Sequence, residues 1–353
     1  MPRARLMLQA LRDWPVTLFP LWSFDDDWAQ VYASIPDTVE VMLGLGLAQL
    51  EGFLERRRGQ YDVLWVSRPP NLQALAPLRA RRPELFAGMR LIYDSEALFA
   101  LREIGELAVK GRALTPAQAQ ARLDKELALA QGVDQVVVVS ERDAGHFRQR
   151  GHPVAILSHA MSVRRSVPSP KRRAGLVFVG ALHPDTPNED GLLWFVEQVA
   201  PRLRALLPEP PTLDVVGECR SERIAALASA DIRLLGPQAD LRPCYDRAKV
   251  FIAPVRFAGG VPVKVIEAAA QGIPVVASAI LLRQLGWQDG QEIQGARDAE
   301  AFARAIARLL TDDARWRRQQ AAAWARCEAD YHPDDFARQT RALLLAHSAQ
   351  EAT

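Results

Sequence analysis

The stretch KVFIAPVRFAGGVPVKVIEAAAQGIPVVAS, Lys249–Ser278, is the part of the chain that decides the fold. Its apolar, β-branched opening predicts a strand that is buried on both faces of a parallel sheet. Gly259 and Gly260 then allow a sharp turn, and Pro262 suits the first turn of a helix. Gly272 predicts the end of that helix, after which a second strand begins. We therefore expect a strand, a glycine loop, a helix and another strand.

The start of this predicted helix carries two charged side chains that suit a nucleoside diphosphate. A helix N-terminus attracts phosphate through its unpaired N–H groups and its partial positive charge. Lys264 lies in the first turn and adds an ammonium group. Glu267 follows one turn later on the same face, about 5 Å along the axis, where a carboxylate can accept hydrogen bonds from ribose hydroxyls. The alternative is a structural glycine turn with a surface Lys and Glu, because such turns are common in doubly wound folds.

Length and composition indicate a globular chain of two domains. The chain has 353 residues, of which 49% are hydrophobic and 24% are charged, and its net charge is +2. This balance gives no general attraction to nucleic acid. The 3 cysteines lack metal-ligand spacing, and no apolar stretch has the length of a membrane span. We therefore expect a cytoplasmic protein, and local arginine clusters leave open a peripheral association with the inner face of an anionic membrane.

Predicted helices and strands alternate through residues 1–160, which favours a mostly parallel α/β sheet. Strands are expected at Val16–Leu21, Val39–Leu43, Tyr61–Val66, Met89–Tyr93, Val133–Val139 and Val154–Leu157. The chain opens with an amphipathic helix, MPRARLMLQALRDW, where a doubly wound domain normally opens with a strand. Residues 1–160 are therefore predicted to form a Rossmann-like domain that lacks its first strand.

The second half of the chain repeats this architecture. Residues 161–175 are rich in Pro, Ser and Arg and have no apolar periodicity, which predicts a linker between domains. Residues 176–330 are expected to form a second Rossmann-like domain that contains the stretch quoted above. Residues 331–353 are predicted to form a C-terminal helix that packs back on the first domain. The expected fold class is α/β, with two doubly wound domains that face a central cleft.

Four stretches of the second half together resemble the C-terminal domain of GT-B glycosyltransferases. They are FVGALHPDTPNEDGLLWF (Phe178–Phe195), LDVVGE (Leu213–Glu218), IRLLGPQADLRPCYDRAKVFIAPV (Ile232–Val255) and GGVPVKVIEAAAQGIPVVAS (Gly259–Ser278). Their order and spacing are similar to those of the retaining enzymes of glycosyltransferase family 4, the group 1 glycosyl transferases. The first half resembles this family more weakly, through YDVLWVSRP, LIYDSEALFALRE and VDQVVVVSERD.

The resemblance implies that loops at one edge of the second sheet bind a nucleotide-sugar donor. The residues it assigns to the donor are Gly180, His183, Gly236, Pro237, Gln238, Arg256, Gly259, Gly260, Val261, Lys264 and Glu267. Residues 236–238 would carry the nucleobase, the glycine loop with Lys264 the pyrophosphate, and Glu267 the ribose. The rule that ligands of open α/β sheets bind at the carboxyl ends of the strands agrees with this placement.

Two departures from the family pattern affect the expected source of positive charge. Many relatives carry a second acidic residue where this chain has Gly259, so contacts with the donor sugar must come from the backbone or elsewhere. Many also carry an Arg and a Lys in the loop that reads HPDTPNEDG here. Lys264, the helix start and Arg256 are then expected to supply the positive field for the phosphates.

Glu96 is the candidate catalytic residue of the first half, beside Lys264 and Glu267 of the second. It follows a predicted strand within YDSEALFALRE, where the resemblance implies the acceptor side. Glu96 or Asp94 is expected to orient the acceptor hydroxyl or to stabilise positive charge on the sugar. Several relatives place a His in this neighbourhood, and its nearest counterpart here is Phe99. A carboxylate that caps a helix start is the open alternative.

The resemblance implies a metal-independent, hexosyltransferase-like enzyme that acts with retention of configuration. It would move a sugar from a nucleotide diphosphate donor to a glycan or lipid-linked acceptor in surface polysaccharide or glycoconjugate synthesis. No cofactor, metal or nucleic acid partner is expected. The alternatives are a catalytically inactive nucleotide-sugar-binding partner subunit, which the missing first strand and acidic residue favour, and a GT-B nucleotide-sugar epimerase. The glycine loop at Gly44–Gln49 lacks a third glycine, which argues against a hydride-transfer enzyme.

Overall fold

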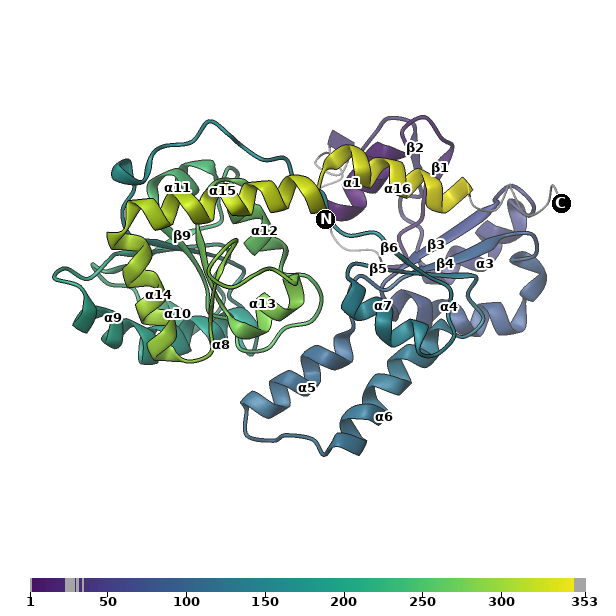
Figure 1. The fold of residues 1–353 in the computed structure, drawn as a ribbon. Helices are drawn as coiled ribbons and strands as arrows, with labels where there is room; N and C mark the ends of the chain where they lie inside the picture. Colours follow the sequence, from purple (N-terminus) through teal and green to yellow (C-terminus); the bar gives the residue numbers. More distant parts are fainter. Residues whose placement is uncertain (1, 23–28, 30–31, 34, 346–353) are drawn as a thin grey trace. The chain divides into compact units, whose positions relative to one another are not determined.

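The computed structural model describes residues 2–22, 29, 32–33 and 35–345, and the chain divides into two compact units (Figure 1). The first unit contains residues 1–100, 116–160 and 333–353. The second contains residues 101–115 and 161–332. The predicted first domain, residues 1–160, therefore contributes one internal segment to the second unit.

One parallel sheet of 6 strands forms the centre of the second unit. Its strands are β7 (Leu176–Val179), β8 (Leu213–Val216), β9 (Ile232–Gly236), β10 (Val250–Ala253), β11 (Val275–Ser278) and β12 (Gln294–Ala296). Their order across the sheet is β12-β11-β10-β7-β8-β9, so the chain runs outward from β7 and resumes on its other side at β10. This reversal creates a switch point between β7 and β10, where ligands of such sheets bind.

Helices cover both faces of this sheet. They are α8 (Pro187–Trp194), α9 (Ala200–Leu206), α10 (Glu222–Ala225), α11 (Arg242–Arg247), α12 (Val263–Ala270), α13 (Ala279–Leu285), α14 (Ala299–Thr311) and α15 (Asp313–Asp330). A π-helical turn, Phe195–Val199, joins α8 to α9. The deciding stretch forms β10, α12 and β11 as predicted, and Gly272, with φ 79°, follows the end of α12 in the left-handed conformation.

A smaller parallel sheet of 4 strands forms the centre of the first unit. Its strands lie in chain order: β3 (Val63–Ser67), β4 (Arg90–Asp94), β5 (Gln135–Val138) and β6 (Val154–Ile156). β1 (Val16–Leu18) and β2 (Val39–Val41) pair with each other in a separate sheet. The connecting helices are α3 (Leu47–Arg56), α4 (Pro69–Arg81), α5 (Phe99–Val109), α6 (Pro116–Leu127) and α7 (Glu141–Arg148).

Helices from the two ends of the described chain pack together in the first unit. α1 (Pro2–Ala10) and α16 (Pro333–Leu345) lie side by side (Figure 1). Arg341 donates a hydrogen bond from Nε to the carbonyl oxygen of Ala10 over 2.7 Å. Phe336 of α16 and Met7 of α1 share a core cluster with Ile92 of β4. Both helices therefore help to bury the apolar surface of this unit.

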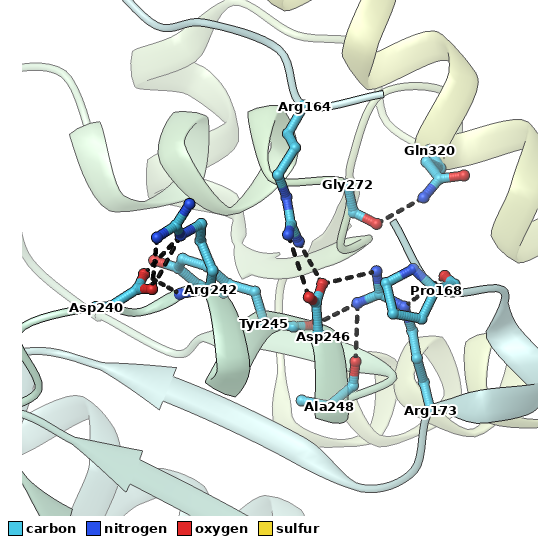
Figure 2. Close-up of polar contacts among 10 residues, drawn as sticks. All are labelled: Arg164, Pro168, Arg173, Asp240, Arg242, Tyr245, Asp246, Ala248, Gly272 and Gln320. Atoms are coloured by element: carbon cyan, nitrogen blue, oxygen red, sulfur yellow. Dashed lines mark hydrogen bonds and ion pairs between the residues drawn. The ribbon is translucent and has the colours of Figure 1, made fainter. Parts of the chain in front are cut away.

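Residues 161–175, predicted as a linker, pack against the second unit (Figure 2). Arg164 forms an ion pair with Asp246 of α11. The side chain of Arg173 is excluded from solvent and donates a hydrogen bond to the carbonyl oxygen of Tyr245. Arginine side chains can bind the free carbonyls at a helix C-terminus, so this composition does not require a detached segment.

Candidate functional site

The candidate site lies where strands β7, β8 and β9 end, and three glycines shape it. The N–H of Gly180 donates to Val216 O over 2.8 Å, and the N–H of Gly217 donates to Gly236 O over 2.9 Å. At Gly217 φ is 136°, and a Cβ atom there would lie 2.1 Å from Gly180 O. Gly236 is also left-handed, with φ 67°. The three strand ends therefore present bare backbone that a ligand can approach closely.

The loop between β10 and α12 contains the predicted phosphate-binding residues. Gly260 adopts φ 70°, a conformation that favours glycine. The N–H of Val263 donates to the carbonyl of Val261 over 2.9 Å, and the N–H of Val265 donates to that of Pro262, also over 2.9 Å. Some of the first N–H groups of α12 are thus used within the loop itself. Fewer backbone N–H groups are therefore free to bind phosphate, so the predicted site depends more on the Lys264 side chain.

Side chains from the end of β11 and from α13 hold the part of the loop that follows β10. Ser278 donates a hydrogen bond to the carbonyl oxygen of Val255, and Gln284 Nε2 donates to that of Ala258 over 3.0 Å. Gln284 lies on α13 and is buried. The sequence pattern carries no signal for this support, because α13 is not among the predicted helices. These contacts fix the backbone that leads into Gly259 and Gly260.

Lys264 and Glu267 lie on one face of α12, as predicted, in surroundings that disfavour both charges. Burial lowers the pKa of Lys264 below its usual value of 10.5, and the Glu267 carboxylate opposes this shift. Burial raises the pKa of Glu267 above 4.5, while the hydroxyl of Tyr245 and the Lys264 ammonium oppose it. The phenol of Tyr245 is fully buried, and burial together with Glu267 raises its own pKa. Sequence reasoning missed Tyr245, which comes from α11.

Contacts with residues 161–175 and α15 stabilise the helices that carry these side chains (Figure 2). Arg173 Nη1 also donates to Ala248 O over 3.3 Å, so it binds the end of α11 next to Tyr245. The N–H of Arg164 donates to Ala270 O, at the end of α12, over 2.9 Å. Gln320 Nε2 donates to the carbonyl of Gly272 over 2.7 Å. The positions of Tyr245 and of Lys264 thus depend on one shared set of polar contacts.

The loops after β7 and β9 reach the same edge of the sheet. His183 Nε2 lies 3.5 Å from the carboxylate of Glu218, which directly follows Gly217. Pro237 and Gln238 are exposed, and Gln238 Nε2 donates to Leu235 O over 2.8 Å. The structure therefore places His183, the predicted nucleobase loop and the glycine-flanked strand ends at one edge of the second unit.

Arg256 does not stand free to neutralise phosphate. Its guanidinium forms a two-point ion pair with Asp190 of α8, in which the Nε–Oδ2 distance is 2.8 Å. A polar cavity of about 420 Å³ lies beside this pair and is also lined by Asp185, Trp194 and Glu197. Because Asp190 already balances its charge, Arg256 contributes less positive field than the sequence suggested.

The two acidic candidates of the first unit differ in their surroundings. Asp94 is fully buried, forms an ion pair with Arg3 of α1 and accepts a hydrogen bond from Trp65 Nε1 over 3.2 Å. Burial raises the pKa of Asp94, and the charge of Arg3 opposes this shift. Glu96 keeps 22% of its side chain exposed and is paired with Arg68. Of the two carboxylates, Glu96 is the one that a substrate can reach.

Neither a metal-binding cluster nor a membrane-spanning helix is found among the described residues. In the described part of the chain, no cluster of three or more His, Cys, Asp or Glu side chains has an arrangement that could hold a metal ion. None of the helices formed by described residues combines the length and apolar character that a membrane span needs.

Comparisons with known proteins agree with this geometry. Residues 173–312 match the model of the family described as glycosyl transferases group 1. No curated protein matches the chain by sequence. Among solved structures, the HepE protein of Anabaena in complex with UDP-glucose is 16% identical, with a TM-score of 0.67 over 97% of this chain and 95% of that one. Sucrose-phosphate synthase from Thermosynechococcus elongatus is 19% identical, with a TM-score of 0.67 over 99% and 93%.

A third solved structure, a glycosyltransferase from Rickettsia africae, is 12% identical, with a TM-score of 0.66 over 97% of this chain and 93% of that one. At these identities the likeness concerns the fold. The family match covers the segment that contains β7 to α14 and the whole candidate donor site. The chain thus has the GT-B fold, and its residues 173–312 resemble the group 1 glycosyltransferases as the sequence motifs predicted.

Proposed function

We propose that this chain is a retaining glycosyltransferase that moves a sugar from a nucleotide diphosphate donor to a hydroxyl of a glycan or lipid-linked acceptor. The observation that carries the proposal is the placement of Lys264 and Glu267 beside a glycine loop at the switch point of the second sheet. The family match over residues 173–312 supports it. Two structures of similar fold are titled as complexes with UDP-glucose and with UDP and glucose, which makes uridine nucleotides the first donors to test.

In this proposal the donor lies along the strand ends in a fixed order. The nucleobase rests on residues 236–238, and Glu267 accepts hydrogen bonds from the ribose. The Tyr245 hydroxyl, from α11, lies near the Glu267 carboxylate and favours its charged form. The diphosphate meets the backbone of residues 259–261 and the ammonium of Lys264, while the sugar points toward the loop that contains His183.

The chemical step requires stabilisation of the departing nucleoside diphosphate. The bond between the anomeric carbon and the diphosphate oxygen breaks, and its electron pair leaves with the diphosphate. The acceptor oxygen forms the new glycosidic bond on the same face, and its proton passes to the departing diphosphate oxygen. Lys264 provides a positive charge in a half-buried position, where electrostatic stabilisation is stronger than in water. We propose that this residue performs the role that a metal ion fills in other transferases.

Thermal-shift measurements with a panel of nucleotide sugars test the proposal. A ligand at 100 times its dissociation constant stabilises the folded state by about 2.7 kcal/mol. UDP-glucose or a related donor should raise the melting temperature of the wild type, and Lys264→Ala and Glu267→Ala should abolish most of that rise. Lys171→Ala, which removes an exposed lysine of the same unit, is the matched control and should retain it.

Turnover separates the enzyme from a binding subunit. Wild-type protein should release UDP from the donor, slowly with water and faster with an acceptor, and Lys264→Ala should lose most of this activity. A donor-induced shift without any hydrolysis or transfer would favour the inactive partner subunit. Undiminished turnover in Lys264→Ala would rule out the proposed site.

A further inference from the structure

Arg68 and Glu96 form an unusual pair at the carboxyl ends of two paired strands in the first unit. Ser67 of β3 and Asp94 of β4 are partners in the parallel register, so the residues that follow them lie at the same sheet edge. Arg68 Nε is 2.5 Å from Glu96 Oε2. This edge of a parallel α/β sheet is where ligands bind.

Both residues have positive φ angles, which side chains disfavour. The φ angle is 75° at Arg68 and 54° at Glu96, and Asp185 is the one other non-glycine residue with positive φ in the described chain. Such strain persists only where the surrounding structure enforces it, and it is concentrated at functional sites. Here two strained residues are joined to each other by an ion pair.

Backbone hydrogen bonds enforce these conformations. The N–H of Arg68 donates to Asp94 O over 2.7 Å, and the N–H of Ser95 donates to Val137 O over 3.0 Å. Pro69, which follows Arg68, begins α4. The loop after β4 is therefore tied to both neighbouring strands, and it projects the Glu96 side chain from a fixed backbone.

The simpler explanation for Glu96, a cap on the following helix, does not apply. The first N–H groups of α5 belong to Phe99 and Ala100, and they donate to Glu126 over 2.9 and 2.6 Å. Glu126 lies on α6 and already satisfies this helix start. Glu96 instead binds Arg68 through Oε2, and no hydrogen bond from another described residue reaches its Oε1 atom. One carboxylate oxygen is thus held and the other is available.

We propose that Arg68 is a positioning residue for acceptor binding. By holding Oε2, it fixes the Glu96 carboxylate and directs Oε1 to accept a hydrogen bond from a hydroxyl of a saccharide acceptor. Glu96 contacts the acceptor, and Arg68 acts through Glu96. This inference rests on the proposed function and adds the acceptor-binding element of the first unit, with a polyhydroxylated sugar as its ligand class.

Kinetics with separate donor and acceptor readouts test this role. UDP-glucose serves as donor, methyl glycosides of glucose, mannose and N-acetylglucosamine serve as acceptors, and water serves as acceptor in the hydrolysis assay. Arg68→Gln and Glu96→Gln should each raise the acceptor KM by about tenfold, whereas the KM for UDP-glucose should stay at the wild-type level. Arg68→Lys should recover part of the loss. The double variant should be no worse than Glu96→Gln alone, since both residues act through one contact.

A matched control exists at the other end of α4. Arg81 Nη2 is also 2.5 Å from a carboxylate oxygen, that of Glu51, and Arg81→Gln should leave the acceptor KM unchanged. An unchanged acceptor KM in Arg68→Gln would overturn the proposal. An equal effect in Arg81→Gln, or a parallel loss of UDP-glucose affinity, would also overturn it. Failure of the proposed function itself would look different, because the wild type would then show neither a donor-induced thermal shift nor hydrolysis.

The strained backbone supplies a readout that does not depend on activity. Glycine accepts φ 54° without cost, so Glu96→Gly should melt at or above the wild-type temperature while it loses acceptor affinity. A residue with a purely structural role would lose stability on the same substitution. A lower melting temperature in Glu96→Gly would therefore overturn the assignment of this strain to acceptor binding.

Discussion

The proposed donor site depends on Lys264. Its ammonium group is costly to keep charged because it is partly buried. A bound diphosphate would place negative charge beside it and restore the preference for the protonated form. Glu267 is shifted in the opposite direction, toward its neutral form. Both shifts have the same cause, because the two charges are partly desolvated and compensate each other only in part.

The lowered pKa of Lys264 predicts a pH dependence of nucleotide binding. Lysine is charged below its pKa, so a lowered pKa means that the charge is lost at a lower pH than usual on the alkaline side. UDP affinity, measured by calorimetry from about pH 7 upward, should fall before the pH reaches the ordinary lysine value of 10.5. Lys264→Arg keeps its charge throughout and should bind UDP with a flatter pH profile. Identical profiles for the two proteins would show that Lys264 does not meet the phosphates.

Residue positions were predictable from the sequence where geometry is local. Lys264 and Glu267 could be placed on one face because helical spacing fixes it. Tyr245 could not be predicted, since it comes near Glu267 only when α11 and α12 contribute to one core cluster in the folded unit. Arg256 is a second residue whose surroundings could not be predicted from the local sequence. Its partner Asp190 lies on α8, and nothing in the local sequence reveals that this ion pair engages its charge.

The ends of strands β7, β8 and β9 approach each other so closely that the site requires glycine there. Gly180 and Gly236 were among the predicted donor residues, and Gly217 between them was not. The motif LDVVGE places a glycine directly after a buried strand, which is a sign of a turn or a close approach. However, only the order of strands in the sheet brings Gly217 against Gly180. A close backbone approach of this kind is a property of the assembled sheet.

Gly217→Ala should therefore damage the site more than an ordinary left-handed glycine does. The new Cβ would lie 2.1 Å from Gly180 O, so the loops after β7 and β8 must separate. We expect a loss of about 2 kcal/mol or more in stability and weaker UDP binding. Gly286→Ala is the control, because its φ of 67° is similarly strained but its Cβ would meet nothing within 4 Å. Chemical denaturation and calorimetry give both quantities, and equal losses in the two variants would contradict the steric argument.

Elements were predictable where their pattern is strong and were missed where it is weak. The strands of the deciding stretch are apolar and bounded by glycine or proline, and they form within a few residues of their predicted limits. α13 follows β11 directly, and its apolar opening AILL continues the apolar pattern of the strand, so Ser278 is the single polar residue at the boundary. β12 is a short edge strand with the sequence QGA, which carries no β signal. Residues 161–175 have a linker-like composition, yet their arginines find partners on the second unit.

At the scale of the whole molecule, the chain path matters as much as the fold of each unit. The chain leaves the first unit after residue 160 and returns to it at residue 333, so the first unit contains helices from both ends of the described chain. The sequence indicated two α/β units through the repeated alternation of strands and helices. It could not place residues 101–115 in the second unit, because that assignment depends on packing between distant segments.

This path predicts that α16 stabilises the first unit without affecting the donor site. Phe336 is 4% exposed and belongs to the cluster of Met7 and Ile92, so Phe336→Ala should cost about 3 kcal/mol or more through lost burial and the cavity left behind. Hydrogen exchange followed by mass spectrometry should become faster in peptides from β4 to β6, while α12 and UDP affinity should be unchanged. Leu345→Ala truncates a residue of the same helix that is 53% exposed and should change neither quantity. If Phe336→Ala instead weakened UDP binding as strongly as it destabilised the first unit, the two units could not be treated as separate cores.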